Sequence, residues 1–294
     1  MNRLESFRAS YARLVTTIAG VPADSSESSR FIDVFADVPR EQFIGPGPWR
    51  IVTQNGYVTV PADDPAFLYQ DFAIALQPDK HINNGQPSLH VRCLAALQIK
   101  TGEQVVHVGA GTGYYTALLS MLVGPSGSVI TFEIDPDLAE KAAANLKNYS
   151  NVSVQNRSGT DGSLPQCDVI YVNAGATAPI DAWLDALRPG GRLLFPLTTA
   201  QGFGAMLLVT RTSSGFAAKF VAQAAFIHCS GARDDETAKR LAEAFKTGGL
   251  GNYQRWGGMW DVNSLHRNSE PDGNCWFAGN GWWLSTKSRE QSNP

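Results

Sequence analysis

Cysteine is scarce in this chain, with 4 residues among 294. Cys93, Cys167, Cys229 and Cys275 lie far apart and form no Cys-x-x-Cys pair. This excludes the common spacings of zinc sites and dithiol redox motifs. We therefore expect reduced thiols, no disulfide framework and no metal site.

Long apolar runs are also absent. No apolar segment approaches the length that spans a bilayer, and the first residues, Met1 to Glu5, lack the apolar core of a signal peptide. Neither charge sign dominates, since 24 Lys and Arg face 27 Asp and Glu for a net charge of −3. We therefore expect a cytoplasmic protein with no nucleic-acid and no membrane partner.

A glycine-rich stretch is the most informative feature that is present. The apolar run Val105–Val108 is followed by Gly109-Ala110-Gly111-Thr112-Gly113 and Tyr114, and a segment compatible with a helix begins at Tyr115. A strand, a glycine turn and a helix in this order build a nucleotide-type pocket at the carboxyl end of a parallel strand. Glycine suits the turn because it lacks a Cβ atom and lets the backbone approach a ligand.

Apolar spacing around this stretch predicts alternating helices and strands. We expect a doubly wound, Rossmann-like α/β sheet that is mostly parallel and ends in a hairpin. The 43% hydrophobic content fits a globular fold of this kind. We predict a helical and irregular N-terminal lid over residues 1–81, a core domain over 82–230 and a Trp-rich extension over 231–294.

Two segments leave their roles open. Prolines and glycines between residues 44 and 71 predict irregular chain. Five tryptophans crowd into the C-terminal extension: Trp256, Trp260, Trp276, Trp282 and Trp283. They either pack on the core or form an aromatic wall for a substrate or partner.

The glycine spacing distinguishes between two cofactor classes. A dinucleotide fingerprint requires a third glycine where Tyr114 stands, whereas the observed Gly-x-Gly-x-Gly pattern suits S-adenosylmethionine, which has no pyrophosphate to seat. Glu133, at the end of the second strand, can accept hydrogen bonds from both ribose hydroxyls. The loop Asn156–Gly162 is placed to border the adenine, and Ser158 and Asp161 are each either adenine contacts or loop caps.

From about Phe35 to Val221 the chain resembles the protein-L-isoaspartate (D-aspartate) O-methyltransferases, which are class I S-adenosylmethionine-dependent enzymes. The resemblance rests on Val38-Pro-Arg-Glu-Gln-Phe43, on Gln86-Pro87 and on the glycine motif. It continues through Glu133, Cys167-Asp-Val-Ile170 and Leu187-Arg-Pro-Gly-Gly-Arg-Leu193. The resemblance implies methyl transfer from S-adenosyl-L-methionine to a carboxylate of a peptide, protein or small molecule, in a divergent member of the family.

Departures from the family pattern fall mainly on the acceptor side. The family's serine beside the transferred methyl aligns with Gly85, which makes Asn84, Gly85 and Gln86 the predicted catalytic segment. Asn83 is a further candidate for substrate binding, because a short amide can donate to a carboxylate. The predicted cofactor-binding residues are His107, Gly109, Ala110, Gly111, Thr112, Gly113, Tyr114, Glu133, Ile134, Ser158, Gly159 and Asn173.

Several alternatives stay open on the sequence alone. His107 is either a hydrogen-bonded core histidine or a contact to the methionine part of the cofactor, and His81 and His90 are either bases or packing residues. The chain could instead methylate a small molecule or a modified peptide, or bind the cofactor without turnover. A dinucleotide oxidoreductase is disfavoured by Tyr114. The sequence makes no prediction of the oligomeric state.

Overall fold

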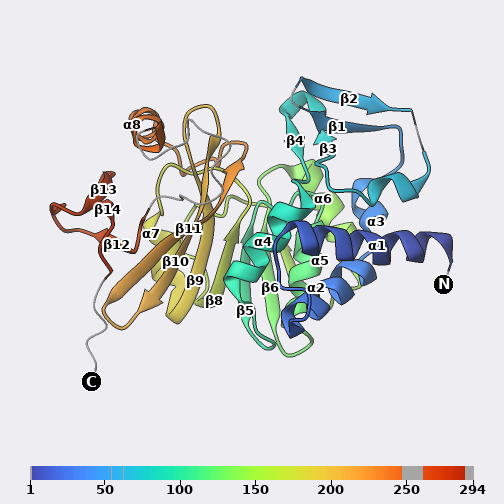
Figure 1. Ribbon diagram of the computed structural model, residues 1–294, viewed down its shortest axis with the longest axis horizontal. Helices are drawn as coiled ribbons and strands as arrows, with labels where there is room; N and C mark the ends of the chain where they lie inside the picture. Colours follow the sequence, from blue (N-terminus) through green and yellow to red (C-terminus); the bar gives the residue numbers. More distant parts are fainter. Residues whose placement is uncertain (1, 54, 62, 247–260, 289–294) are drawn as a thin grey trace. The chain divides into compact units, whose positions relative to one another are not determined.

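The computed structural model describes residues 2–53, 55–61, 63–246 and 261–288. Their contacts divide the chain into two compact units, residues 1–157 and 158–294 (Figure 1). This boundary differs from the predicted one at residue 81, because the N-terminal helices pack onto the helices of the first unit rather than apart from them. The predicted three-part division at 81 and 230 stays a prediction.

The first unit combines a three-stranded parallel sheet with flanking helices. Strands β5 (Gln104–Val108), β6 (Ser128–Phe132) and β7 (Val152–Gln155) pair in parallel, with Val105 opposite Val129 and Val129 opposite Val152. The other elements of the unit are α1 (Arg3–Ile18), α2 (Ser26–Asp37), α3 (Arg40–Ile44), β1 (Trp49–Thr53), β2 (Gly56–Val60), the 3-10 turn η1 (Pro65–Leu68), β3 (Ala75–Gln77), η2 (Pro78–Lys80), β4 (Ile82–Asn83), α4 (Pro87–Leu97), α5 (Tyr114–Val123) and α6 (Pro136–Asn145).

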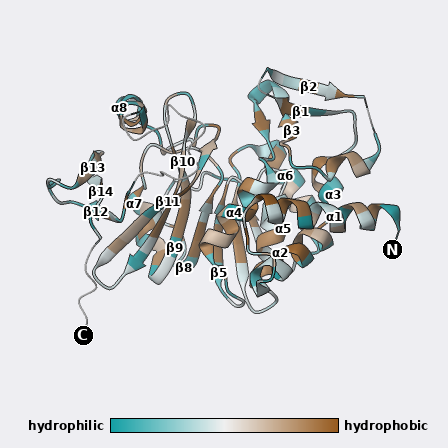
Figure 2. Ribbon diagram, viewed as in Figure 1, coloured by the Kyte–Doolittle hydropathy of each residue, from teal (hydrophilic) through white to brown (hydrophobic). Residues whose placement is uncertain are grey.

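Helix α5 lies against β5 and β6, and its sequence explains its burial. Apolar residues occupy nearly every position, and the ribbon is brown along this helix in Figure 2. Only Met121 is exposed among its large apolar side chains. A helix that is apolar on all sides is stable when it is buried inside a protein. Because α5 packs on β5 and β6, the glycine turn that precedes it lies at the end of the sheet.

Residues 49–60 correct one expectation. They form the antiparallel hairpin β1–β2, with Trp49 opposite Val60 and Thr53 opposite Gly56, and not irregular chain. Proline and glycine content masked the signal, which is Asn55-Gly56 between two segments rich in β-branched residues. A small core of Trp49, Leu68 and Ile74 lies close by.

The second unit extends its sheet further than predicted. β8 (Cys167–Val172) and β9 (Leu187–Thr198) are parallel, and the pairings that join β9 to the later strands, and those strands to one another, are antiparallel. The remaining elements are α7 (Asp181–Ala186), β10 (Phe203–Thr212), β11 (Gly215–Ala225), α8 (Asp235–Phe245), β12 (Ser264–Arg267), β13 (Cys275–Ala278) and β14 (Trp282–Ser285). Neighbouring strands follow the order β9-β10-β11-β12-β14-β13 in the sheet.

The α/β, Rossmann-like class is confirmed, and its antiparallel part comprises a hairpin plus the strands of the C-terminal extension. Trp282 and Trp283 are buried in β14, and Trp276 packs edge-on against Phe220. These contacts favour the packing role for the extension. Trp256 and Trp260 lie outside the described residues.

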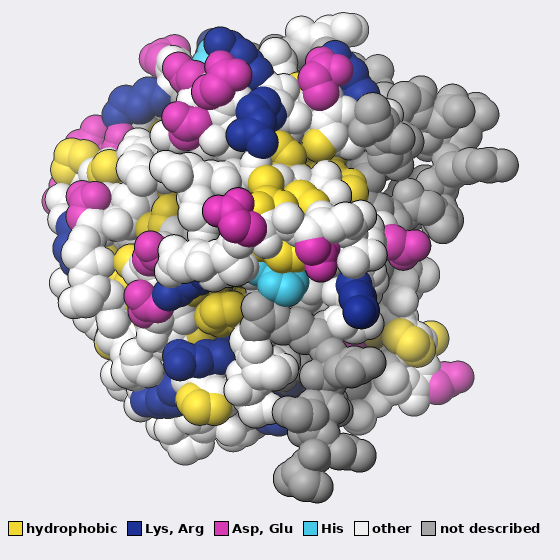
Figure 3. Space-filling model, turned by 90° about the vertical axis from the view of Figure 1, so that its left-hand side faces the viewer, with side chains coloured by type: hydrophobic (Ala, Val, Ile, Leu, Met, Phe, Trp, Pro, Cys, Tyr) yellow, Lys and Arg dark blue, Asp and Glu magenta, His cyan; other side chains and the backbone are white. Residues whose placement is uncertain are grey.

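The described residues contain neither a candidate membrane-spanning helix nor a candidate metal-binding cluster. None of their helices is both long and apolar enough to cross a membrane. No three His, Cys, Asp or Glu side chains gather there in a metal-binding group. On the face drawn in Figure 3, acidic and basic side chains are interspersed rather than separated by sign.

Candidate functional site

The glycine turn after β5 takes the sharp conformation that its sequence predicts. Gly109, Gly111 and Gly113 have φ of 84°, 55° and 96°, in the left-handed region that favours glycine. The amides of Gly109 and Ala110 donate to the carbonyl oxygen of Phe132, at 2.8 and 3.2 Å. The turn is therefore joined directly to the end of the neighbouring strand β6.

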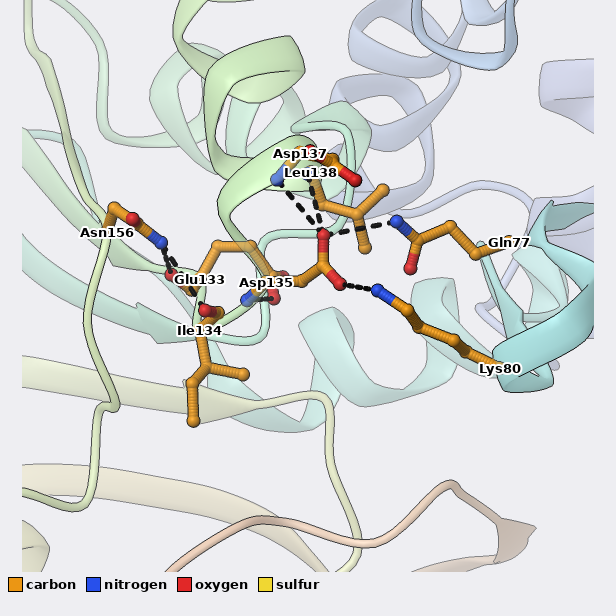
Figure 4. Close-up of polar contacts among 8 residues, drawn as sticks. All are labelled: Gln77, Lys80, Glu133, Ile134, Asp135, Asp137, Leu138 and Asn156. Carbon is orange, nitrogen blue, oxygen red and sulfur yellow. Dashed lines mark hydrogen bonds and ion pairs between the residues drawn. The ribbon is translucent and has the colours of Figure 1, made fainter.

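Glu133 stands at that strand end, next to Ile134 and Asp135 (Figure 4). Its Oε2 accepts the amide of Gly111 at 2.7 Å, and its Oε1 accepts the amide of Asp135 at 3.0 Å. Burial raises the pKa of this carboxyl, and hydrogen bonds from the backbone amides of Asp135, Gly111 and Ile134 oppose that rise. Because a carboxylate has about four acceptor positions, it can still accept a hydrogen bond from a ligand.

Asp135 connects the same strand end to the N-terminal part of the unit. It caps α6 by accepting the amides of Asp137 and Leu138, both at 3.1 Å. It also accepts from the Nε2 of Gln77 at 3.1 Å and forms an ion pair with Lys80 (Figure 4). The ammonium group of Lys80 lowers the pKa of Asp135. The segment β3–η2 is thus fastened beside Glu133.

The sequence did not predict the roles of Gln77, Lys80 and Asp135. The Asp135-Pro136 pair was a usable signal, because an acidic N-cap followed by proline at the first helical position marks a helix start. Nothing in the sequence indicates that Lys80, 55 residues away, reaches this cap. Asn156 adds a further brace by donating to the Glu133 carbonyl at 2.9 Å.

His107 is fully buried in β5 beside two hydroxyls. Its Nδ1 lies 2.9 Å from the Oγ1 of Thr116 and 3.3 Å from the Oγ1 of Thr131. Burial lowers its pKa to about 3, so the imidazole is neutral. These contacts support the core-histidine alternative, and a contact to the cofactor stays a prediction.

Tyr114 and Tyr115 begin α5 and meet the N-terminal helices. The hydroxyl of Tyr114 lies 3.4 Å from that of Tyr11, in α1. Phe35 and Phe43 pack edge-on against the Tyr114 ring. The predicted lid therefore packs directly onto the helix that follows the glycine turn.

Residues 83–88 lead into α4 and use their polar groups unequally. Oδ1 of Asn83 accepts the amide of Gly85 at 2.9 Å, and Nε2 of Gln86 donates to Asp71 at 2.9 Å. Asp71 also accepts from the amide and hydroxyl of Ser88, at 2.8 and 2.7 Å. Gln86 is thus committed to a structural contact in this state.

Asn84 differs from its neighbours. Its Oδ1 accepts the amide of Ile74 at 2.7 Å, whereas its Nδ2 is buried with no hydrogen-bond partner among the described residues. The hydroxyl of Tyr115 is in the same condition. Unsatisfied buried polar groups are rare and often mark a site that a ligand completes. Of the two other candidate bases, His81 is exposed and stacks on Tyr57, and His90 is buried in α4.

Three of the predicted cofactor residues, Ser158, Gly159 and Asn173, belong to the second unit. The hydroxyl of Ser158 lies 2.7 Å from that of Thr160, and the carbonyl of Gly159 accepts the indole N–H of Trp183 at 2.9 Å. Asn173 follows the buried strand β8 and is partly buried. Their contact with a cofactor stays a prediction, as does that of Ala110, Thr112 and Ile134.

Comparison with known proteins extends over most of the chain. A sequence model of the protein-L-isoaspartate(D-aspartate) O-methyltransferases matches residues 23–234. A protein-L-isoaspartate O-methyltransferase of Ignicoccus hospitalis is 31% identical over 172 residues, which is 57% of this chain and 81% of that protein. Its counterpart in Methanococcus aeolicus is 35% identical over 156 residues, or 50% and 71% of the two chains.

Solved structures show the same fold at lower identity. A protein-L-isoaspartate O-methyltransferase aligns with a TM-score of 0.61 at 20% identity, covering 86% of this chain and 73% of the other. A candidate enzyme of that name from Plasmodium falciparum, solved in complex with S-adenosyl-L-homocysteine, aligns with a TM-score of 0.59 at 17% identity. That alignment covers 79% of this chain and 100% of the Plasmodium chain.

Proposed function

Because the chain belongs to the protein-L-isoaspartate(D-aspartate) O-methyltransferase family, a family of S-adenosylmethionine-dependent enzymes, we propose that it methylates a carboxylate oxygen of a peptide or protein. The observation that carries the proposal is the joined geometry of the glycine turn and Glu133 within a family match of residues 23–234. The acceptor that fits the names of its relatives is an isoaspartyl residue.

The residues of the first unit fit this cofactor. Gly109, Gly111 and Gly113 leave the backbone of the turn open to a ligand, and Glu133 retains acceptor capacity for a ribose hydroxyl. Asn84 and Tyr115 carry buried polar groups without described partners near the predicted acceptor segment. S-adenosylmethionine, when bound, supplies an activated methyl group on a sulfonium.

The protein has little acid–base chemistry to perform in this reaction. A carboxylate is ionised at neutral pH, so its oxygen needs no general base before it forms the bond to the methyl carbon. The carbon–sulfur bond breaks as the carbon–oxygen bond forms, which gives a methyl ester and S-adenosylhomocysteine. We propose that Asn84, Gly85 and Gln86 align the acceptor and that the N-terminal helices keep water out.

The test is methyl transfer to a defined peptide pair. Equal concentrations of an isoaspartyl peptide and its aspartyl counterpart are incubated with saturating labelled S-adenosylmethionine. Label in a base-labile ester of the isoaspartyl peptide alone is the expected result. Label in a metabolite extract but in neither peptide would move the acceptor to a small molecule. A cytoplasmic location and the absence of nucleic-acid and membrane partners stay predictions from composition.

A further inference from the structure

The space for a side chain at position 85 is filled by another residue, His90. Gly85 has φ of 71°, and a Cβ atom built on it would lie 2.2 Å from the Nε2 of His90 and 3.0 Å from its Cδ2. Non-bonded carbon and nitrogen atoms do not approach to 2.2 Å. The imidazole of His90 and any side chain at position 85 therefore exclude one another.

The ring of His90 is held in a defined place. It is buried, with 2% of its surface exposed, and it stacks on Tyr115 with ring centroids 3.5 Å apart and planes 13° from parallel. Its amide donates to the Gln86 carbonyl at 3.3 Å, which fixes the first turn of α4. Burial lowers the pKa of His90 well below its usual value, and His107 and Arg40 lower it further. A neutral imidazole carries one N–H donor and one acceptor nitrogen.

Two uncharged polar groups belong to residues next to this pair. Asn84 precedes Gly85 in the chain, the Tyr115 ring stacks on His90, and both Nδ2 of Asn84 and the hydroxyl of Tyr115 are buried without described partners. Each can donate a hydrogen bond to a carboxylate oxygen. An unsatisfied buried donor is costly, so a ligand that accepts from either group would be favoured.

From this arrangement we infer that His90 is the specificity-determining side chain of the acceptor end, standing in for a residue-85 side chain and offering a neutral hydrogen-bonding edge to the acceptor carboxylate. The inference rests on the proposed carboxylate acceptor. Neutral groups suit the reaction, because the charges of carboxylate and sulfonium disappear as the new bond forms. A cation bound to the carboxylate would hold it more tightly before transfer than during it, which does not accelerate the step. The buried cation whose charge acts on His90, Arg40, donates to the carbonyl oxygens of Leu68, Gln70 and Phe72.

The exchange between positions 85 and 90 is tested with G85S, H90A and the double variant G85S/H90A. H90Q keeps a neutral donor of similar reach, and H81N is a control at an exposed histidine whose left-handed backbone asparagine tolerates. Each protein is assayed for S-adenosylhomocysteine binding by calorimetry, for thermal unfolding, and for KM and kcat with an isoaspartyl peptide.

H90A is expected to raise the peptide KM about tenfold or more, the loss of one hydrogen bond to a charged acceptor, while cofactor affinity changes less than threefold. H90Q should recover part of that loss, and H81N should match the wild type. G85S should lose peptide activity and unfold at a lower temperature, and the double variant should regain at least part of both. Either a double variant no better than G85S, or an H90A peptide KM within twofold of wild type, overturns the inference.

A wild-type protein that binds S-adenosylhomocysteine but methylates no peptide would refute the proposed acceptor instead. The unfolding temperatures still test the exchange in that case. Recovery in the double variant supports it, and additive losses overturn it.

Discussion

Replacing Glu133 with glutamine tests the proposed hydrogen bond between this carboxylate and a ribose hydroxyl of the cofactor. Oε2 of the carboxylate accepts the Gly111 amide at 2.7 Å and Oε1 accepts the Asp135 amide at 3.0 Å, and a carboxylate has about four acceptor positions in all. Glutamine has the same length but only one oxygen, and its NH2 group would face one of the two amides. At least one backbone donor and one ribose hydroxyl then lose a charged acceptor.

Hydrogen bonds to charged groups contribute about 1.5–3 kcal/mol each. The loss of one ribose bond predicts S-adenosylhomocysteine binding weaker by about 10–100-fold, since 1.4 kcal/mol corresponds to tenfold. The unpaired amide predicts a free energy of unfolding lower by about 1–3 kcal/mol. Calorimetric titration and urea unfolding measure the two quantities separately.

A matched control is E140Q, because Glu140 lies on the α6 surface and has no described bond to the turn. It should bind and unfold like the wild type. Affinity of E133Q within threefold of the wild type, in a protein that still unfolds cooperatively, would refute a ribose contact at Glu133.

Three further predictions follow from buried groups. G113A should unfold at a lower temperature than G162A. Both glycines have positive φ, 96° and 70°, but only at Gly113 would a Cβ atom meet atoms within 4 Å, and the closest is Leu146 Cδ1 at 2.8 Å. An equal decrease of the unfolding temperature in both variants would contradict this packing. Burial lowers the pKa of His107 to about 3 in the folded chain, so the unfolded chain binds more protons below pH ~6.5. The free energy of unfolding therefore decreases as the pH is lowered below that value. When the pH is lowered from ~6.5 to ~5, the free energy of unfolding in urea should decrease by about 1–2 kcal/mol more for the wild type than for H107Q. The same pH dependence in both proteins would show that His107 takes up its proton as readily in the folded chain as in the unfolded one. Glu133 should give the opposite pH dependence. Its pKa is raised in the folded chain, so folding disfavours its ionised form, and the unfolding free energy of the wild type relative to E133Q should decrease as the pH rises through that pKa. A difference between the two proteins that does not change with pH would refute this prediction.

The conformation of the glycine turn and the place of Glu133 at a strand end could be predicted from sequence because their determinants are local. The turn requires glycine at positive φ, and Glu133 must follow a buried strand, so spacing alone places both. Helix starts are local in the same way, because α4 and α6 begin at Pro87 and Pro136, a residue type that suits the first helical position, and α5 begins directly after the glycine turn.

Non-local contacts explain what the sequence did not predict. Lys80 and Gln77 reach Asp135 only because β3 and η2 fold beside α6, and neither residue type signals such a partner. By its spacing in α4, His90 looks like a packing residue. Its proposed role depends on the contact between its ring and the Gly85 backbone, which the sequence does not indicate. The extent of β12–β14 likewise depends on pairing with β11, which lies about 40 residues earlier in the chain.

Carboxylate methylation is the claim on which the other proposals depend, and one competition measures it directly. Wild-type protein, shown by calorimetry to bind S-adenosylhomocysteine, is given labelled S-adenosylmethionine and peptides that differ only in an isoaspartyl or aspartyl linkage. The account predicts label that is released as methanol by mild base, from the isoaspartyl peptide alone. No base-labile label in either peptide, with the cofactor site saturated, would contradict it.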